Sequence, residues 1–275
     1  MKIVYFGTDV FLPCFRYLAD REEVLALYSY HNDEDYFTEH EIVREARSRG
    51  IPVTLGRIDE ERVRSFFEKE GCELFFVAEY NYVIPIPADL VRFRGLNVHS
   101  SLLPEGRGCY PIECAMARGL RETGVTMHKI VPQVDTGDVL FQSRIGISPE
   151  MDCVDVYLES SRRALELTKR LFADFENAWA AACPQGRIGD FWAKPSRDLM
   201  TIDHGMTVAQ AMAVYRSYDK MTLVRIGGRL YHVVAAERGR ATLICPEIEV
   251  SDGHFLYEMA DGHLRLAVLK KGAGE

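Results

Sequence analysis

An amide and an imidazole lie two residues apart, at Asn97 and His99. They stand at the end of an apolar run and directly before a turn rich in glycine and proline. Residues i and i+2 of a β-strand point to the same face, so these two side chains are predicted to project together from a strand end. A hydrogen-bond donor beside a titratable base is the combination that acyl transfer needs.

The segment 134–138, Val-Asp-Thr-Gly-Asp, could bring a carboxylate to this pair. Either Asp135 or Asp138 could raise the basicity of His99 and fix its tautomer. An ordinary aspartate-rich turn is the alternative, because aspartate is common in turns. The residues alone leave the choice between the two aspartates open. His128 precedes this segment and is a candidate for binding a substrate.

The elements that must position these residues alternate between strand and helix through the first two-thirds of the chain. This rhythm predicts an α/β fold with a doubly wound, mostly parallel sheet. Active sites of such sheets gather beyond the carboxyl ends of the strands, where His99 is expected. The predicted strands are 3–6, 24–30, 51–53, 74–77 and 96–99, and a hairpin of 124–130 and 139–147 follows. The predicted helices are 12–19, 39–49, 60–70, 112–118 and 152–181.

The regular alternation of strand and helix signals ends after residue 182. A cluster of structure-breaking residues at 183–189 predicts a loop, and the following residues remain loop-like. We therefore predict a catalytic domain over 1–183, a linker over 184–205 and a small C-terminal module over 206–275. One helix at 207–215 and several short β runs predict a barrel-like, β-rich module. These runs are 222–226, 229–235, 242–244, 255–258 and 264–269.

Composition excludes several classes of protein. The 275 residues are 47% hydrophobic and 27% charged, which is typical of soluble globular proteins. A formal net charge of −8 disfavours tight binding to a long nucleic acid. No apolar run is long enough to span a membrane, and the N-terminus reads as a strand and not as a signal peptide. We therefore expect a cytoplasmic protein without membrane or nucleic-acid partners.

Three further patterns argue against disulfides, metal ions and dinucleotide cofactors. The seven cysteines are scattered without a C-x-x-C pair, which disfavours a disulfide framework or a zinc site. The acidic cluster 31–35, His-Asn-Asp-Glu-Asp, is interpreted as solvated charge or a substrate contact and not as a metal site. Gly7-Thr8-Asp9 lacks the G-x-G-x-x-G pattern, so the strand and helix alternation does not indicate a dehydrogenase.

Several motifs together resemble the 10-formyltetrahydrofolate-dependent formyltransferases over roughly residues 1–180. The resemblance rests on Asn97-x-His99-x-Ser101-Leu102-Leu103-Pro104, Arg107-Gly108, Pro111-Ile112, Gly119, Thr123-Gly124-Val125-Thr126 and Val134-Asp135-Thr136-Gly137-Asp138-Val139-Leu140. This family includes methionyl-tRNA formyltransferase, glycinamide ribonucleotide formyltransferase and the sugar N-formyltransferases. The resemblance implies a Rossmann-like catalytic domain, 10-formyltetrahydrofolate as formyl donor, no metal, and Asn97, His99 and Asp135 as catalytic residues. It favours Asp135 over Asp138, because the catalytic aspartate of the family precedes the turn.

The resemblance also implies binding residues. The loop 79–85 is similar to the tyrosine-bearing loop of the sugar-directed members. The resemblance implies that folate lies against Tyr82, Val83, Ile84 and Pro85 of this loop and against Val134. It also implies that the acceptor is bound by Tyr80, Arg107, Tyr110, His128 and Lys129.

The nature of the acceptor is indicated by charge. The tRNA-directed members carry a basic insertion after the second strand, where this chain has the acidic cluster 31–35. An acidic loop would repel an acceptor stem. We therefore expect a nucleotide-linked amino-deoxy sugar, of the kind used for surface polysaccharides such as O-antigen. The alternatives are methionyl-tRNA, another small amine such as a hydroxyornithine, and a folate-binding protein without catalysis.

The C-terminal module resembles those of the family as well. Ile202-Asp203 matches the start of a family motif whose next residue is aromatic, and here His204 stands in that place. The residues 260–266 match an Asp-Gly-x-Leu hairpin. The module could form a homodimer interface or a wall of the substrate site, or it could be a relic without a present role.

The expected mechanism is direct transfer without a covalent enzyme intermediate. The acceptor amine attacks the formyl carbon, and Asn97 and a protonated His99 donate hydrogen bonds to the oxyanion. Asp135 orients His99 and helps to take the amine proton.

Overall fold

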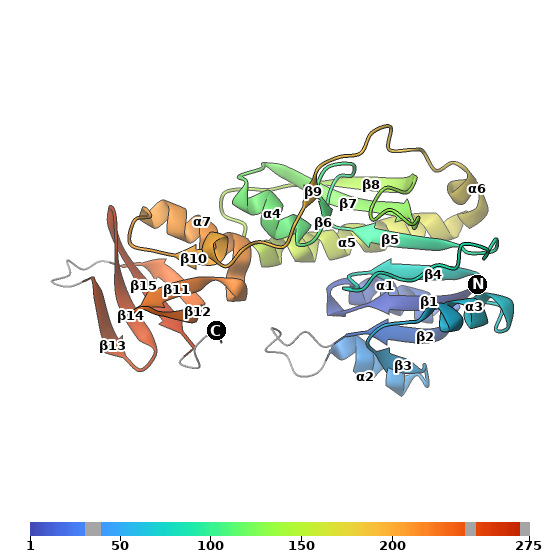
Figure 1. Ribbon diagram of the computed structural model, residues 1–275, viewed down its shortest axis with the longest axis horizontal. Coiled ribbons are helices and arrows are strands. Elements are labelled where there is room, and N and C mark those ends of the chain that lie inside the picture. The colour runs from blue at the N-terminus through green and yellow to red at the C-terminus, as the bar shows by residue number, and fades with distance from the viewer. Residues whose placement is uncertain (31–39, 240–245, 270–275) are drawn as a thin grey trace. The chain divides into compact units, whose positions relative to one another are not determined.

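The alternating signals of the first two-thirds of the chain form one seven-stranded sheet with helices on both faces (Figure 1). Hydrogen-bonded neighbours follow the order β3-β2-β1-β4-β5-β7-β8. The first five strands of this order pair in parallel, and β7 pairs with β5 in the antiparallel sense. The predicted mostly parallel α/β sheet is confirmed. The strands are β1 (Lys2–Gly7), β2 (Glu23–Ser29), β3 (Val53–Leu55), β4 (Leu74–Ala78), β5 (Gly95–His99), β7 (Glu122–Lys129) and β8 (Val139–Gly146).

The computed structural model describes residues 1–30, 40–239 and 246–269, and the chain divides into two units. The first unit consists of Met1–Gly108, Thr123–Gly146 and Tyr157–Phe191. The second consists of Cys109–Glu122, Ile147–Val156 and Trp192–Glu275. Residues 184–191, which fall in the predicted linker, thus belong to the first unit.

Both faces of the first unit's sheet are buried, because apolar side chains alternate along its strands. In β1, Ile3 and Tyr5 pack with the core that α1, α2 and α5 cover, whereas Val4 and Phe6 pack with the core that α3 covers. The unit is therefore a sheet between two helical layers. Its helices are η1 (Asp9–Phe11), α1 (Leu12–Ala19), α2 (Glu41–Ser48), α3 (Glu60–Glu68), α5 (Cys153–Ala173) and α6 (Phe175–Ala180), and α5 begins in the second unit.

The strand order reverses at β1, which lies between β2 and β4. Ligands of open α/β sheets bind outside the carboxyl ends of strands near such a switch point. Gly7 ends β1 here, and a Cβ atom at this position would lie 2.2 Å from the carbonyl oxygen of Ala78 on β4. The glycine is thus explained by close packing of two strands. Asp9 accepts hydrogen bonds from the backbone amides of Glu41 and Ile42, so it caps the start of α2.

One predicted helix is wrong in its extent. The predicted helix 152–181 is two helices, because Asp174 has φ −156° and ψ 68° and interrupts the helical hydrogen bonds. The Asp174 carboxylate instead accepts a hydrogen bond from the Asn177 side chain at 2.9 Å. A local polar contact therefore overrides the helical periodicity at this residue.

The second unit contains a six-stranded, mostly antiparallel sheet with the order β10-β11-β12-β15-β14-β13. The predicted β-rich C-terminal module is confirmed, whereas strand β13 was not predicted. Thr207 is the N-cap residue of α7 and forms a capping box with Gln210. The helices and strands of the second unit are α4 (Pro111–Ala117), η2 (Asp198–Met200), β10 (Thr201–Ile202), α7 (Val208–Tyr218), η3 (Asp219–Met221), β11 (Leu223–Ile226), β12 (Arg229–Arg238), β13 (Glu247–Ser251), β14 (His254–Met259) and β15 (Gly262–Val268). The short strand β6 (Arg107–Gly108) belongs to the first unit and pairs with β9 (Phe191–Trp192), which begins in the first unit and ends in the second.

His204 takes an aromatic role in this unit. Its ring stacks on Tyr257 with centroids 3.9 Å apart and planes 8° apart. Nδ1 lies 2.7 Å from the carbonyl oxygen of Glu258, and Nε2 lies 3.2 Å from the Glu247 carboxylate. The imidazole thus packs its ring face on Tyr257, while both of its nitrogens lie near oxygen atoms. The predicted run 242–244 lies outside the described residues. Over 1–30, 40–239 and 246–269, no helix is both long and apolar enough to cross a membrane.

Candidate active site

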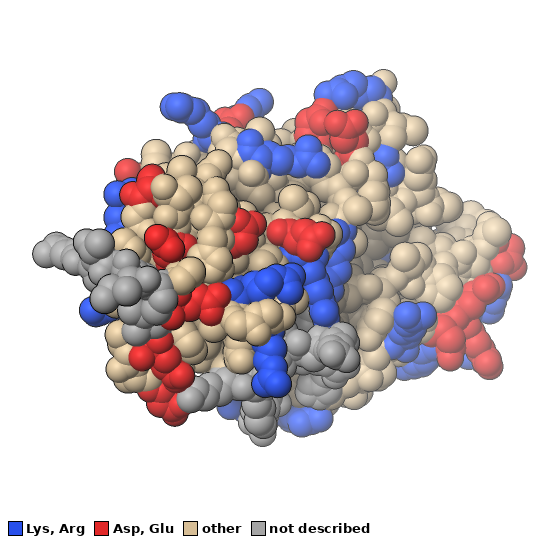
Figure 2. All heavy atoms as spheres, turned by 60° about the vertical axis from the view of Figure 1, so that its left-hand side comes forward, with Lys and Arg blue, Asp and Glu red and all other residues tan. Residues whose placement is uncertain are grey.

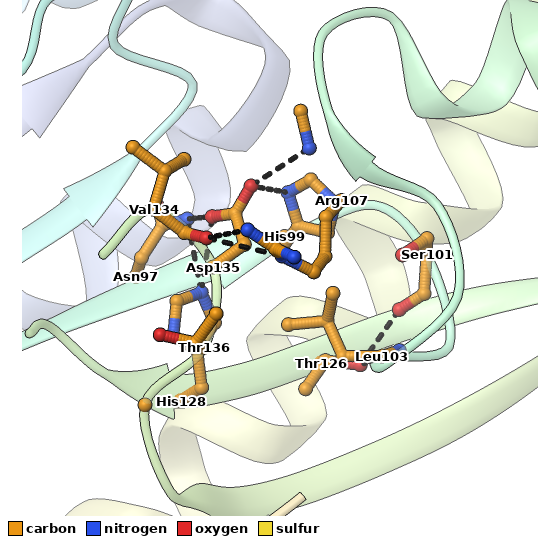
Figure 3. A network of polar contacts seen from close by, with 12 residues as sticks. Asn97, His99, Ser101, Leu103, Arg107, Thr126, His128, Val134, Asp135 and Thr136 are labelled. Atoms are coloured by element: carbon orange, nitrogen blue, oxygen red, sulfur yellow. Dashed lines mark hydrogen bonds and ion pairs between the residues drawn. The ribbon is translucent and has the colours of Figure 1, made fainter. Parts of the chain in front are cut away.

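Asn97 and His99 project from the carboxyl end of β5, as their spacing predicts (Figure 3). The neighbouring strand β7 places His128 opposite Asn97 and Thr126 opposite His99. Side chains directly opposite each other on an antiparallel pair are close enough to interact. Accordingly, Asn97 Nδ2 lies 3.3 Å from His128 Nε2.

Asp135 reaches this pair from the loop between β7 and β8. Its Oδ2 lies 3.8 Å from His99 Nδ1, and its Oδ1 lies 3.5 Å from His128 Nε2. The same Oδ1 lies 3.4 Å from Asn97 Nδ2, and the backbone amide of Gly108 donates to Oδ2 at 2.9 Å. The structure thus brings together the three residues predicted to be catalytic, in a largely buried cluster.

The remaining ring nitrogen of His99 is fixed by the backbone. Nε2 lies 2.7 Å from the carbonyl oxygen of Gly106. A carbonyl oxygen only accepts hydrogen bonds, so Nε2 carries a proton. Burial lowers the pKa of His99 below its ordinary value of 6.5, although the Asp135 carboxylate opposes this effect. The neutral ring is thus favoured, with a lone pair on Nδ1, which differs from the protonated His99 of the expected mechanism.

The carboxylate beside this lone pair is charged. Burial by itself raises the pKa of Asp135, but the positive charge that His99 carries when it is protonated, the contact with His128 and the Gly108 amide together hold it well below its ordinary value. A proton that arrives at His99 Nδ1 would therefore form an ion pair with Asp135. The geometry suits a base that gains a partner when it is protonated.

The loop that follows β5 is held by a small polar network around Thr126 (Figure 3). The Thr126 hydroxyl donates to the carbonyl oxygen of Ser101 at 2.6 Å and accepts from the backbone amide of Leu103 at 3.1 Å. Gln142 Nε2 donates to the same hydroxyl at 2.9 Å and to the Leu103 carbonyl oxygen at 2.6 Å. This loop carries Gly106, so the network helps to position the Gly106 carbonyl oxygen that lies next to His99 Nε2.

Several predicted binding residues have structural partners. Arg107 is buried, and its guanidinium donates to the carbonyl oxygens of Val134 and Gly189. Lys129 Nζ lies 3.9 Å from an Asp138 carboxylate oxygen and 5.0 Å from the Trp179 ring centroid. Asp138 thus pairs with Lys129, and Asp135 is the aspartate beside His99. Roles for Arg107 and Lys129 in binding the acceptor remain predictions.

The predicted folate loop follows β4 at the same edge of the sheet. Tyr80 donates to the carbonyl oxygen of Gly56 at 2.6 Å, and its ring lies 5.4 Å from that of Tyr82. Tyr30 lies against both tyrosines, and the Arg57 guanidinium lies 4.9 Å from the Tyr82 ring centroid. These side chains form an aromatic cluster beyond the carboxyl ends of β2, β3 and β4.

The residues expected to contact the folate include exposed apolar side chains. Val83 is 76% exposed and Val134 is 43% exposed, whereas Ile84 is buried and Pro85 is half-buried. Exposed apolar side chains at the carboxyl edge of the sheet suit a flat heteroaromatic ring. Tyr110 belongs to the second unit, where it precedes α4 with φ 53°. The acidic cluster 31–35 lies outside the described residues.

Sequence reasoning missed several contributors to the site. The Gly106 carbonyl and the Gly108 amide are backbone groups, which residue types cannot reveal. Gln185 donates to the carbonyl oxygens of Asp135 and Gly137, yet it lies in a cluster of loop residues some 50 positions later. Within the part of the chain that the structure describes, no three His, Cys, Asp or Glu residues are grouped for metal binding.

Known proteins resemble this chain in sequence and in fold. Residues 42–169 match the family described as formyl transferase. The methionyl-tRNA formyltransferase of Synechococcus sp. strain JA-3-3Ab is 31% identical over 198 residues, which are 67% of this chain and 61% of that protein. The chain thus spans about three-fifths of the length of this curated relative.

Solved structures share the fold. HypX from Aquifex aeolicus, solved in complex with tetrahydrofolic acid, gives a TM-score of 0.75 at 16% identity, over 97% of this chain and 43% of that one. The N-formyltransferase from Helicobacter canadensis, solved with folinic acid and dTDP-3-aminofucose, gives a TM-score of 0.66 at 17% identity, over 97% and 98% of the two chains. With the matched family and the cluster at the end of β5, the comparisons show that this chain carries a domain of the formyl transferase family.

Proposed function

We propose that this chain transfers the formyl group of 10-formyltetrahydrofolate to the amine of a nucleotide-linked amino-deoxy sugar. The observation that carries the reaction is the convergence of an amide, a neutral imidazole and a charged carboxylate, from Asn97, His99 and Asp135. These groups supply an oxyanion donor, a base and a partner for the protonated base. Formyl transfer to an amine needs all three.

Asn97 supplies the donor for the oxyanion. Its Nδ2 contacts to His128 and Asp135 are long, at 3.3 and 3.4 Å, so the amide is not committed to a short hydrogen bond. It can donate to the negative charge that develops on the formyl oxygen when the amine attacks. Loss of one such donor typically lowers the rate by about 10²–10³-fold.

His99 moves the proton. As the new C–N bond forms, Nδ1 takes one proton from the attacking amine, and the imidazolium pairs with Asp135, 3.8 Å away. As the bond to the leaving nitrogen breaks, that proton is returned to it, so charge and atoms balance. The Gly106 carbonyl oxygen keeps the ring oriented throughout, because it holds Nε2–H.

The folate supplies the formyl carbon and leaves as tetrahydrofolate. Tyr82, Val83 and Ile84, from the loop after β4, and Val134, from the loop that carries Asp135, would hold it. The exposed apolar side chains of Val83 and Val134 fit this role. The aromatic cluster of Tyr30, Tyr80 and Tyr82 with Arg57 offers ring faces and a positive charge, which suit a heteroaromatic ligand that carries negative charge.

Size and charge support the sugar acceptor. The structure from Helicobacter canadensis, solved with dTDP-3-aminofucose, covers 97% of this chain and 98% of its own length. The net charge is −8, and on the face shown in Figure 2 acidic and basic side chains lie interspersed among uncharged ones. Recognition of tRNA depends strongly on basic surface that neutralises phosphates.

Methionyl-tRNA is the second candidate acceptor, because the sequence relatives at 31% identity carry that name. The test is to incubate the purified chain with 10-formyltetrahydrofolate and a panel of dTDP- and UDP-linked amino sugars, methionyl-tRNA and hydroxyornithine. Mass spectrometry detects a formyl group on each acceptor. We expect formylation of an amino sugar, and formyl-methionyl-tRNA as the sole product would overturn the sugar assignment.

A further inference from the structure

The backbone of the turn that carries Asp135 is held by side chains from two other segments. Arg107 Nη2 and Nε donate to the Val134 carbonyl oxygen at 3.0 and 3.2 Å. Gln185 Nε2 donates to the carbonyl oxygens of both Asp135 and Gly137, each at 2.9 Å. Distant side chains thus hold the peptide carbonyls of Val134, Asp135 and Gly137.

The turn needs such support because its backbone is unusual. Asp135 has φ 56°, a left-handed conformation that residues with a Cβ atom rarely adopt. A Cβ atom on Gly137 would lie 1.8 Å from the Lys129 carbonyl oxygen, so the turn also packs tightly on the end of β7. Relaxation of Asp135 to an ordinary φ would redirect its carboxylate away from His99.

The amide of Gln185 can occupy its place in only one orientation. Both of its partners are carbonyl oxygens, so a flipped amide would set its own oxygen against two acceptors. In the observed orientation, Oε1 is buried and has no hydrogen-bond partner among the described residues. Burial of the Gln185 Oε1 acceptor without a partner costs free energy. The two hydrogen bonds that Nε2 donates offset this cost, so we take them to be the role of this side chain.

We propose that Gln185 is a positioning residue for formyl transfer, which holds the 135–137 turn so that the Asp135 carboxylate faces the His99 imidazole. The inference deepens the proposed function and rests on it. Gln185 itself need not touch the substrates, because both of its hydrogen bonds go to backbone oxygens. Its loss should therefore act on the chemical step more than on binding.

The test compares Gln185→Met, which keeps the length of the side chain and removes the donors, with Ile188→Ala as a control. Ile188 is 62% exposed on the same segment. We expect kcat of Gln185→Met to fall about 10–100-fold, because a catalytic group displaced by about 1 Å costs a factor of this order. KM for the folate and the acceptor should stay within about threefold, and Ile188→Ala should match the parent protein in each value.

A second readout does not depend on activity. The imidazole of His99 is titrated by NMR, with its signal assigned by loss in His99→Ala. Asp135 raises the pKa of His99 while burial and His128 lower it, so displacement of the carboxylate should move the titration midpoint to lower pH. A Gln185→Met protein with an unchanged midpoint would overturn the inference, whether or not its kcat falls. If no acceptor is formylated, the proposed function fails while the titration still tests the positioning.

Discussion

Replacement of Thr126 by valine should destabilise the first unit without changing the shape of the side chain. Thr126 is fully buried, and its hydroxyl holds the Ser101 carbonyl oxygen and the Leu103 amide at 2.6 and 3.1 Å. Valine would leave both backbone groups without this partner in a buried place. Each such group costs about 1–3 kcal/mol, so the variant should lose about 2–6 kcal/mol of unfolding free energy.

The measurement uses urea unfolding with a tryptophan reporter of the first unit. The chain's two tryptophans are Trp179 and Trp192, and Trp179 lies in the first unit. A Trp192→Phe background therefore restricts the fluorescence signal to that unit. Thr54→Val serves as control, because Thr54 is exposed on β3 of the same sheet, and it should change stability by less than about 0.5 kcal/mol.

The result that would refute this reasoning is a Thr126→Val protein as stable as the Thr54→Val control. It would show that the network around Thr126 does not hold the loop after β5. A loss within the expected range, with a lower kcat as well, would connect the network to the Gly106 carbonyl that orients His99.

Three further predictions concern the catalytic groups. Asn97→Ala should lower kcat by about 10²–10³-fold, because it removes the proposed oxyanion donor. The control is Asn177→Ala, which removes an exposed amide of α6 and should leave kcat unchanged. Initial rates measure both variants, and a loss below about threefold for Asn97→Ala would contradict the prediction. Burial lowers the pKa of His99, so the acid limb of the pH profile of kcat/KM should lie below 6.5, and Asp135→Asn should move it to still lower pH. Burial and neighbouring groups depress the folded-state pKa values of His99 and Asp135, so at these two residues the folded state binds fewer protons than the unfolded state. Their contribution to the unfolding free energy should be fully present near pH 7. It should be lost as the pH drops, first through His99 below about pH 6.5 and then through Asp135 below about pH 3.8; a stability that rises between pH 7 and low pH would contradict this.

Local pattern predicted much of this fold and part of its site. Asn97 and His99 follow from the period of two along a strand, and the alternation of strands and helices predicted the parallel sheet. The choice between Asp135 and Asp138 could not follow from the residues, because both flank the same turn. The structure separates them through backbone conformation, since Asp135 is left-handed and faces His99, whereas Asp138 pairs with Lys129.

Contacts between distant segments explain what sequence pattern missed. Gln185 lies among proline and glycine residues, where local pattern predicts only a loop, and its role appears when the fold brings it to the Asp135 turn. The break at Asp174 was missed because the residues on both sides keep a helical period. In both cases the contacts of one polar side chain decide the outcome, and the local sequence pattern does not reveal them.

The central claim is that His99 and Asp135 act on a formyl group that moves from folate to an amine. The most direct measurement supplies 10-formyltetrahydrofolate with a ¹³C-labelled formyl carbon and follows the label into the acceptor by NMR, for the parent protein and for His99→Ala. We predict transfer of the label to a primary amine by the parent protein, and a rate at least about 10²-fold lower for the variant. Near-parental transfer by His99→Ala would contradict the account.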